Sequence, residues 1–176
     1  MNRALGISLF VITLVLASCS TKKNSTPNRA ETQKQAELTE KEQLDFAYIF
    51  FEAEKDKLLG NLGQAKEKFS QAIRINPRSS AAHFELSQIY LQTGELELAE
   101  QSGKQAIRFD DTNKWYKMSM ADILERNGKY KEIIPLLDQL SKMEPGNPDY
   151  LLGMGAAQTQ LGDFSGAIKT YDRLEK

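Results

Sequence analysis

Glycine recurs at intervals of 34 residues along this chain, at Gly60, Gly94, Gly128 and Gly162. Two further series keep the same interval and hold mostly small residues: Ala53, Ser87, Ala121 and Gly155 in one, and Ala65, Ala99, Ile133 and Ala167 in the other. An interval that stays in phase through four cycles is the signature of a repeat architecture. We therefore expect a series of similar units that bury apolar surface against their neighbours.

Each unit carries start and stop signals for two helices. Ser79, Asn113 and Asn147 share the 34-residue interval and are strong N-cap residues, and Pro148 follows at a first helical position that needs no N–H. The periodic glycine comes about three turns later and can adopt the left-handed conformation that ends a helix. The pattern predicts helix–turn–helix units. The capping box from Thr39 to Glu42 predicts that the first helix starts near residue 40.

The unit resembles the tetratricopeptide repeat (TPR), whose pattern places aromatic, small and proline residues at fixed positions. The second repeat carries it as Leu86, Tyr90, Ala99 and Ala106, and the first as Ala65, Phe69, Ala72 and Pro77. The resemblance implies an all-α, right-handed solenoid of about four repeats. They would span residues 46–79, 80–113, 114–147 and 148–176, within an array over 40–176. The last repeat is incomplete, so we expect the chain to be the N-terminal piece of a longer protein.

The N-terminal residues resemble a lipoprotein signal peptide. Arg3 precedes an apolar run that is too short for the roughly 20 residues of a membrane-spanning helix. The sequence from Leu16 to Cys19 resembles a lipobox, which implies cleavage after residue 18 and lipidation of Cys19. Residues 19–39 are expected to form a disordered tether. The alternative is an uncleaved signal anchor with an incidental cysteine. Ser20 in place of aspartate implies a lipid anchor in the outer membrane, facing the periplasm.

The composition contains few residues that could catalyse a reaction or bind a metal ion. The chain has one cysteine, one histidine and a net charge of −1, so neither a catalytic set nor a basic nucleic-acid surface is expected. His83, the only histidine, is expected to pack between helices. The glycines are isolated, so no phosphate-binding loop is predicted. We therefore expect no enzyme activity, no cofactor, no metal and no small-molecule substrate.

The resemblance also implies a binding surface. In TPR proteins the inner face is lined by the first helix of each repeat, and the matching positions here would be partner-binding: Phe50, Phe84, Gln88, Trp115, Met118, Asp122 and Leu152. Trp115 stands out because tryptophan dominates interface hot spots. The alternative is that the three aromatic residues pack between repeats and meet no ligand. The chain lacks the lysine–asparagine–arginine set with which chaperone-binding TPR domains hold a C-terminal carboxylate.

These features together predict a membrane-tethered scaffold or adaptor that binds a protein or peptide partner in the bacterial cell envelope. Two alternatives stay open. One is a fixed subunit of an envelope assembly machine, of the outer-membrane protein assembly or pilus biogenesis type. The other is the recognition module of a longer protein whose catalytic domain lies beyond residue 176.

Overall fold

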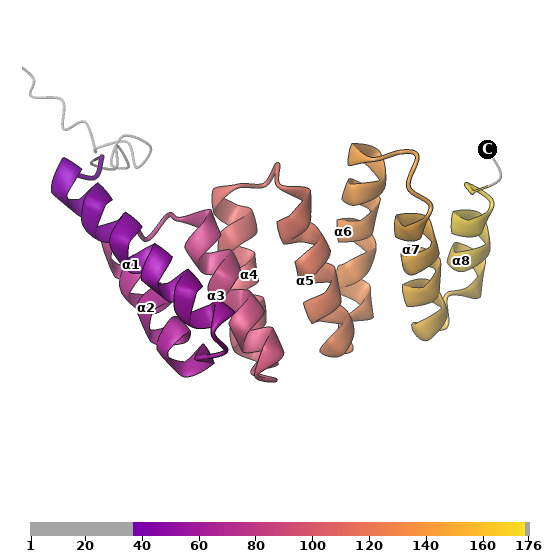
Figure 1. Cartoon of the computed structure of the whole chain (residues 1–176). Helices are drawn as coiled ribbons and strands as arrows, with labels where there is room; N and C mark the ends of the chain where they lie inside the picture. The colour runs from indigo at the N-terminus through magenta and orange to yellow at the C-terminus, as the bar shows by residue number, and fades with distance from the viewer. Residues whose placement is uncertain (1–36, 175–176) are drawn as a thin grey trace, which may run out of the picture. The chain divides into compact units, whose positions relative to one another are not determined.

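A computed structural model of the chain describes residues 37–174, which contain eight α-helices and no strand (Figure 1). The helices are α1 (Glu40–Leu58), α2 (Leu62–Ile75), α3 (Ser80–Gln92), α4 (Leu96–Phe109), α5 (Lys114–Arg126), α6 (Tyr130–Met143), α7 (Asp149–Gln160) and α8 (Phe164–Tyr171). None of these helices combines the length and the apolar character that crossing a bilayer requires. The predicted signal peptide, Cys19 and most of the tether lie outside the described residues.

The helices form four antiparallel pairs that match the predicted repeats (Figure 1). Within each pair the two helices pack together, and the second helix also packs against the first helix of the following pair. Contacts thus run almost entirely between neighbours in the chain, as expected of a solenoid. The all-helical repeat fold predicted from the 34-residue interval is confirmed.

The start of α1 also agrees with the sequence. The Thr39 hydroxyl accepts a hydrogen bond from the Glu42 amide at 3.3 Å, and the Glu42 carboxylate accepts one from the Thr39 amide at 2.8 Å. This reciprocal capping box starts the helix at Glu40. As a result α1 is 19 residues long, whereas the first helices of the other repeats have 12 or 13.

The turn inside each repeat is the one that the periodic glycines predict. Their φ angles lie between 67° and 79°, in the left-handed region that favours glycine. In every repeat the amide of the residue after the glycine donates to a carbonyl five residues back, at 2.8 to 2.9 Å. This bond belongs to the Schellman motif, which satisfies carbonyls left over at the helix end.

Two of the three predicted N-caps, Ser79 and Asn113, are confirmed by their hydrogen bonds. The Ser79 hydroxyl accepts from the Ala82 amide at 3.1 Å, and the Asn113 carbonyl oxygen accepts from the Trp115 amide at 3.0 Å. At the fourth repeat the N-cap is Pro148, one residue later than predicted, and the side chain of Asn147 before it accepts from the Asp149 amide at 3.0 Å. Each repeat boundary therefore has a defined helix start.

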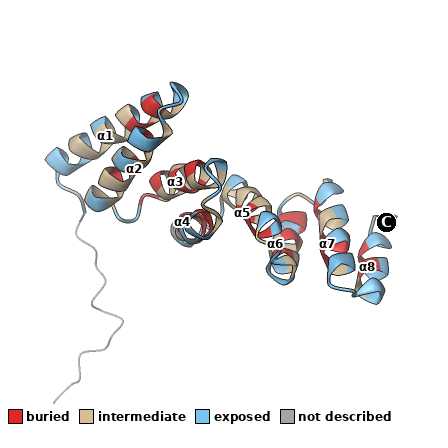
Figure 2. Ribbon diagram, turned by 90° about the horizontal axis from the view of Figure 1, so that it is seen from below, coloured by how far each residue is buried: buried red, intermediate tan, exposed pale blue. Residues whose placement is uncertain are grey.

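The core lies where the helices face one another (Figure 2). Small residues allow the paired helices to approach closely, and Ala53, Ala65, Ser87 and Ala99 have no exposed surface. Large apolar side chains fill the spaces around these crossings, and the largest that are fully buried are Phe69, Ile89, Ile123 and Leu140. The alternation of small and large residues gives the interdigitated packing of a protein interior.

A buried carboxylate joins the second repeat to the third. Glu100 on α4 is 6% exposed, and it accepts hydrogen bonds from Lys104 at 2.6 Å, Lys129 at 2.7 Å and Asn127 at 3.0 Å. Burial by itself would raise the pKa of Glu100, but the bonds from the two lysines outweigh it and hold the pKa below the ordinary value. The turn before α6 is thereby fixed to α4.

Candidate partner-binding face

The first helices of the four repeats together form a surface that we call the first-helix face, made by α1, α3, α5 and α7. All seven predicted partner-binding residues lie on these helices. Trp115 and Leu152 are 60% and 47% exposed, and the other five are half-buried: Phe50, Phe84, Gln88, Met118 and Asp122. The two exposed side chains are the ones most available to a partner.

The two phenylalanines are held by aromatic neighbours. The ring of Phe50 lies 5.4 Å from that of Phe69 in an edge-to-face arrangement, and Phe84 lies 4.8 Å from Tyr116 of the next repeat. Such pairs contribute about 0.5–1.5 kcal/mol beyond their buried area. These contacts agree with the alternative in which both rings pack within the array.

Polar side chains connect α3 and α5 on this face. The amide of Gln88 on α3 donates a hydrogen bond to the Ser119 hydroxyl on α5, and within α5 Arg126 pairs with Asp122 at 3.2 Å. Between the two helices lies an open hollow of about 470 Å³, the α3–α5 hollow, bordered by Gln88, Leu91, Gln92, Asp122 and Arg126. Its walls are mainly polar, so it suits a hydrogen-bonding chain segment.

A second and more apolar space lies next to it. The α5–α7 cavity has a volume of about 330 Å³ and is bounded by α5, α6 and α7. Its lining residues are Met118, Ala121, Asp122, Glu125, Tyr130, Ile133, Leu137, Leu140, Tyr150, Gly153, Ala156, Ala157 and Gln160. Of the predicted residues, Met118 and Asp122 line this cavity, and Asp122 borders both spaces. The cavity is the part of the face that sequence reasoning did not identify.

One wall of the cavity is fixed by a chain of hydrogen bonds. The Tyr150 hydroxyl donates to the Glu144 carboxylate at 2.6 Å and lies 3.6 Å from the sulfur of Met118. Lys114 also pairs with Glu144. The bond to Glu144 raises the pKa of Tyr150, while the Lys114 ammonium, followed by the Tyr150 hydroxyl, lowers the pKa of Glu144. The tyrosine ring is therefore held in place before any ligand arrives.

Trp115 lies at the N-terminal end of α5 beside a cation. The Lys114 ammonium is 5.0 Å from the centre of its ring. At an exposed site such a contact is worth about 0.5–1 kcal/mol. It orients the ring while leaving most of it exposed.

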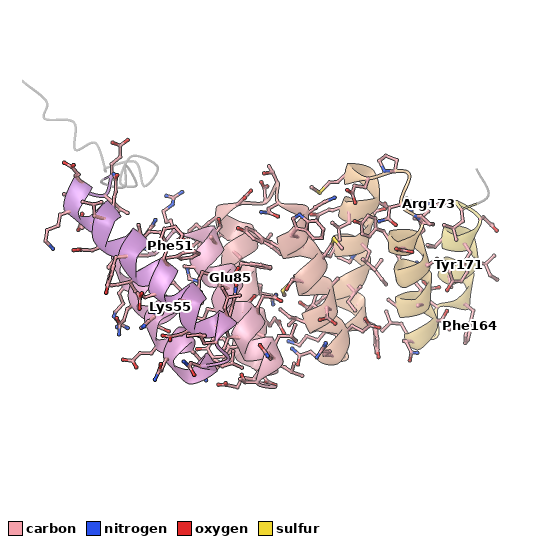
Figure 3. The ribbon with its side chains drawn as sticks, in the orientation of Figure 1. Phe51, Lys55, Glu85, Phe164, Tyr171 and Arg173 are labelled. Carbon is pink, nitrogen blue, oxygen red and sulfur yellow. The ribbon has the colours of Figure 1, made fainter. Side chains whose placement is uncertain are left out.

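Two groups of exposed apolar side chains lie outside the seven predicted residues. On α1, Leu44, Tyr48, Phe51 and Leu58 are all at least 66% exposed, on the side away from the core, and Figure 3 shows Phe51 beside Lys55. Their spacing of four, three and seven residues is readable in the sequence as a second helical stripe. Another group lies on α8, at Phe164, Ile168 and Tyr171, and Figure 3 labels Phe164 and Tyr171.

The chemistry of the described residues is otherwise sparse. Within residues 37–174, no group of three or more histidine, cysteine, aspartate or glutamate side chains is placed to hold a metal ion. The His83 ring lies 5.6 Å from that of Phe109, and its Nε2 atom is 3.0 Å from the Pro77 carbonyl oxygen. This histidine packs at the repeat boundary, as expected.

Comparison with protein families assigns the repeats. Two models described as tetratricopeptide repeat match residues 59–114 and 124–176, which are 56 and 53 residues, or 109 of the 176. Proteins of this kind generally mediate protein–protein interactions, and the fold is typically a non-catalytic module.

Two curated proteins are similar over part of their length. Cellulose synthase operon protein C of Pseudomonas fluorescens (strain SBW25) is 28% identical over 119 residues, which are 67% of this chain and 9% of that protein. Tetratricopeptide repeat protein 21A of Mus musculus is 28% identical over 95 residues, 54% of this chain and 7% of that protein. The chain thus spans less than a tenth of the length of either relative.

Solved structures share the fold. A crystal structure of MamA has a TM-score of 0.64 at 15% identity, covering 73% of this chain and 75% of that one. MamA from Desulfovibrio magneticus RS-1 gives 0.63 at 12%, covering 78% and 75%. YrrB, described as a TPR protein with an unusual peptide-binding site, gives 0.62 at 14%, covering 71% and 64%. These similarities concern the fold alone. With four matching helix pairs and two family matches, the chain belongs to the tetratricopeptide-repeat family.

Proposed function

We propose that this protein is a lipid-anchored scaffold of the bacterial cell envelope that binds a protein or peptide partner through its first-helix face. One observation carries the proposal. The α3–α5 hollow and the α5–α7 cavity adjoin at Asp122, so that a polar space and an apolar space follow each other along one face. The exposed side chains of Trp115 and Leu152 lie on α5 and α7, two of the helices that line the cavity.

The face has the composition that protein recognition requires. Interfaces combine an apolar centre with polar groups that fix orientation, and aromatic anchors contribute most of the energy. Here the polar groups of Gln88 and Asp122 are already held by neighbours, and Tyr150 is fixed by Glu144. A surface that is ordered before binding loses less entropy when the partner arrives. The peptide-binding site of YrrB, which shares this fold, supports the proposal by analogy.

The sequence around Cys19 supports the lipid anchor. Cys19 follows Leu16, Ala17 and Ser18 in a lipobox-like order, and it is the only cysteine in the chain. Lipidation at Cys19 would hold the protein on the membrane, and the polar residues after it would form the tether. The residue after the cysteine is Ser20, which supports an outer-membrane position facing the periplasm. In cells, Cys19→Ala should abolish labelling by radioactive palmitate and release the protein from the membrane fraction. Continued labelling of that variant would contradict the anchor.

The binding role is tested by capture of partners from crosslinked envelope membranes. The test variant is Trp115→Ala with Leu152→Ala, which removes two exposed side chains from the face. The matched control is Leu98→Ala, a 41% exposed leucine on α4, a second helix. We expect a dominant partner that the wild type and the control retain and the double variant loses. A partner retained equally by all three proteins would refute binding through this face.

A further inference from the structure

The α5–α7 cavity exists because α7 is built from smaller residues than the other first helices. Ile89 and Ile123 lie 34 residues apart, and each has at most 1% of its surface exposed. The next position in this series is Ala157, which lines the cavity. Similarly, Gly153 follows Glu85 and Ser119 in its own series. The third and fourth repeats thus lack side-chain volume that fills the matching place between earlier repeats.

The size and walls of the cavity define what it can accept. An apolar cavity of about 150 Å³ is large enough for benzene, so one of 330 Å³ accommodates a phenol or indole ring. Ile133, Leu137 and Leu140 of α6 supply apolar surface on one side. Ala156 and Ala157 of α7 supply the opposite side, and neither projects far enough to fill the space.

The charged residues of the wall are all acidic. Asp122 and Glu125 line the cavity, and no lysine or arginine does. Asp122 is paired with Arg126 at 3.2 Å. Glu125 is exposed, and within residues 37–174 it makes no ion pair. An uncompensated carboxylate beside an apolar cavity favours a ligand that carries a positive charge next to its apolar group.

We infer that the α5–α7 cavity binds one aromatic side chain of a peptide segment, with a lysine or arginine of the same segment placed against Glu125 and Asp122. This inference rests on the proposed function and specifies the partner's chemistry at one point of the first-helix face. From that anchor the segment continues past Asp122 into the α3–α5 hollow, whose amide groups on Gln88 and Gln92 can bond to its backbone.

Three short peptides test the inference directly. The probes are N-acetylated, C-amidated tripeptides with the sequences Lys-Trp-Lys, Glu-Trp-Glu and Lys-Gly-Lys, titrated into the ¹⁵N-labelled full chain and followed by NMR. We expect the first to bind with a dissociation constant on the order of 1 mM and to shift the amides of Ala121, Gly153 and Ala157. The other two should bind at least tenfold more weakly. Equal binding of Glu-Trp-Glu, or shifts that leave these three amides unmoved, would overturn the inference.

Two variants test separately the volume of the cavity and the negative charge beside it. Ala157→Ile places in the fourth repeat the side chain that the second and third already carry, so it should fill the cavity and weaken Lys-Trp-Lys at least tenfold. Ala81→Ile, on α3 outside both spaces, is its control. Glu125→Lys should weaken the same peptide about tenfold, whereas Glu97→Lys, the same charge change on α4, should leave it unchanged. Full binding by both test variants would also overturn the inference.

The captured partner distinguishes this inference from the proposed function. If the partner is lost with Trp115→Ala and Leu152→Ala but retained with Ala157→Ile, the face binds it without the cavity, and only the inference fails. If none of these changes affects capture, the proposed function fails as well. Loss of the partner in both variants, with the Ala81→Ile control unaffected, supports both.

Discussion

The contact between α7 and α8 allows a sharp test of the packing. A Cβ atom added at Gly155 would lie 2.3 Å from Cε1 and 2.4 Å from Cζ of the Tyr171 ring, far inside van der Waals contact. Gly155→Ala therefore cannot be accommodated unless the ring moves. Tyr171 is 37% exposed, so it can rotate outward, but it then loses the packing that joins the two helices (Figure 3).

Two opposing contributions set the magnitude. Alanine is favoured over glycine in a helix interior by about 0.8–1.0 kcal/mol. Overpacking typically costs about 1–3 kcal/mol. We therefore expect Gly155→Ala to lower the free energy of unfolding by about 1 kcal/mol in the wild type. In a Tyr171→Ala background the obstacle is absent, and the same change should stabilise the protein. The double-mutant cycle should give a coupling free energy of about 1–3 kcal/mol.

Urea unfolding followed by circular dichroism at 222 nm measures these differences, and hydrogen exchange of the α8 amides localises them. Gly63→Ala is the matched control, because it lies in α2 and a Cβ there meets no atom within 4 Å. It should be neutral or stabilising. If Gly155→Ala is as favourable as Gly63→Ala with Tyr171 present, the close contact between α7 and α8 does not exist in solution.

Three other changes address the core, the turns and the buried carboxylate. Phe69→Ala removes a fully buried ring and should lower the free energy of unfolding by about 3–5 kcal/mol in the same urea experiment. Gly94→Ala forces a side chain onto φ 78° and should cost about 1–2 kcal/mol, measurable as a lower thermal midpoint. Glu100→Gln should cost about 1–3 kcal/mol at pH 7 by weakening the bonds from Lys104 and Lys129. Because the folded-state pKa of Glu100 is lowered, its contribution is present above the ordinary glutamate pKa and is lost as the pH falls through the folded value. The stability difference between wild type and Glu100→Gln should therefore shrink below about pH 4, and a constant difference would contradict the assignment.

The helices were predictable because their signals are local. Each depends on a residue whose own backbone or side chain makes the structure, such as Gly60 with its positive φ, Asn113 at its cap, or Thr39 in its capping box. The 34-residue interval repeats these signals and reduces the number of compatible folds to a single class. Small residues such as Ala65 correctly predicted where two helices cross, because helices can approach closely only where their side chains are small.

The binding face was only partly predictable, because it depends on what lies across from each residue. The sequence identified Met118 and Asp122, which line the α5–α7 cavity, but not the cavity. That space results from the small side chain at Ala157. A small residue predicts a cavity only when the residues around it, here Leu137 and Leu140, are known to leave the space unfilled. The packing of Phe84 against Tyr116 likewise depends on side-chain positions that spacing does not determine.

The exposed stripe on α1 was missed for a different reason. The helix is apolar on two sides, so Phe50 and Ala53, which face the core, obscure the periodicity of Leu44, Tyr48 and Phe51 on the opposite side. A single helical pattern with one apolar face does not describe such a helix.

The most direct test of the central claim is photocrosslinking in cells from defined positions. A benzophenone amino acid is placed at Leu152 on the first-helix face in one strain, and at Leu98 on α4 in another; these side chains are 47% and 41% exposed. If the protein binds its partner through the first-helix face, irradiation gives a discrete crosslinked product from position 152 and none from position 98. A product from position 98 without one from position 152 would show that the partner binds elsewhere on the array.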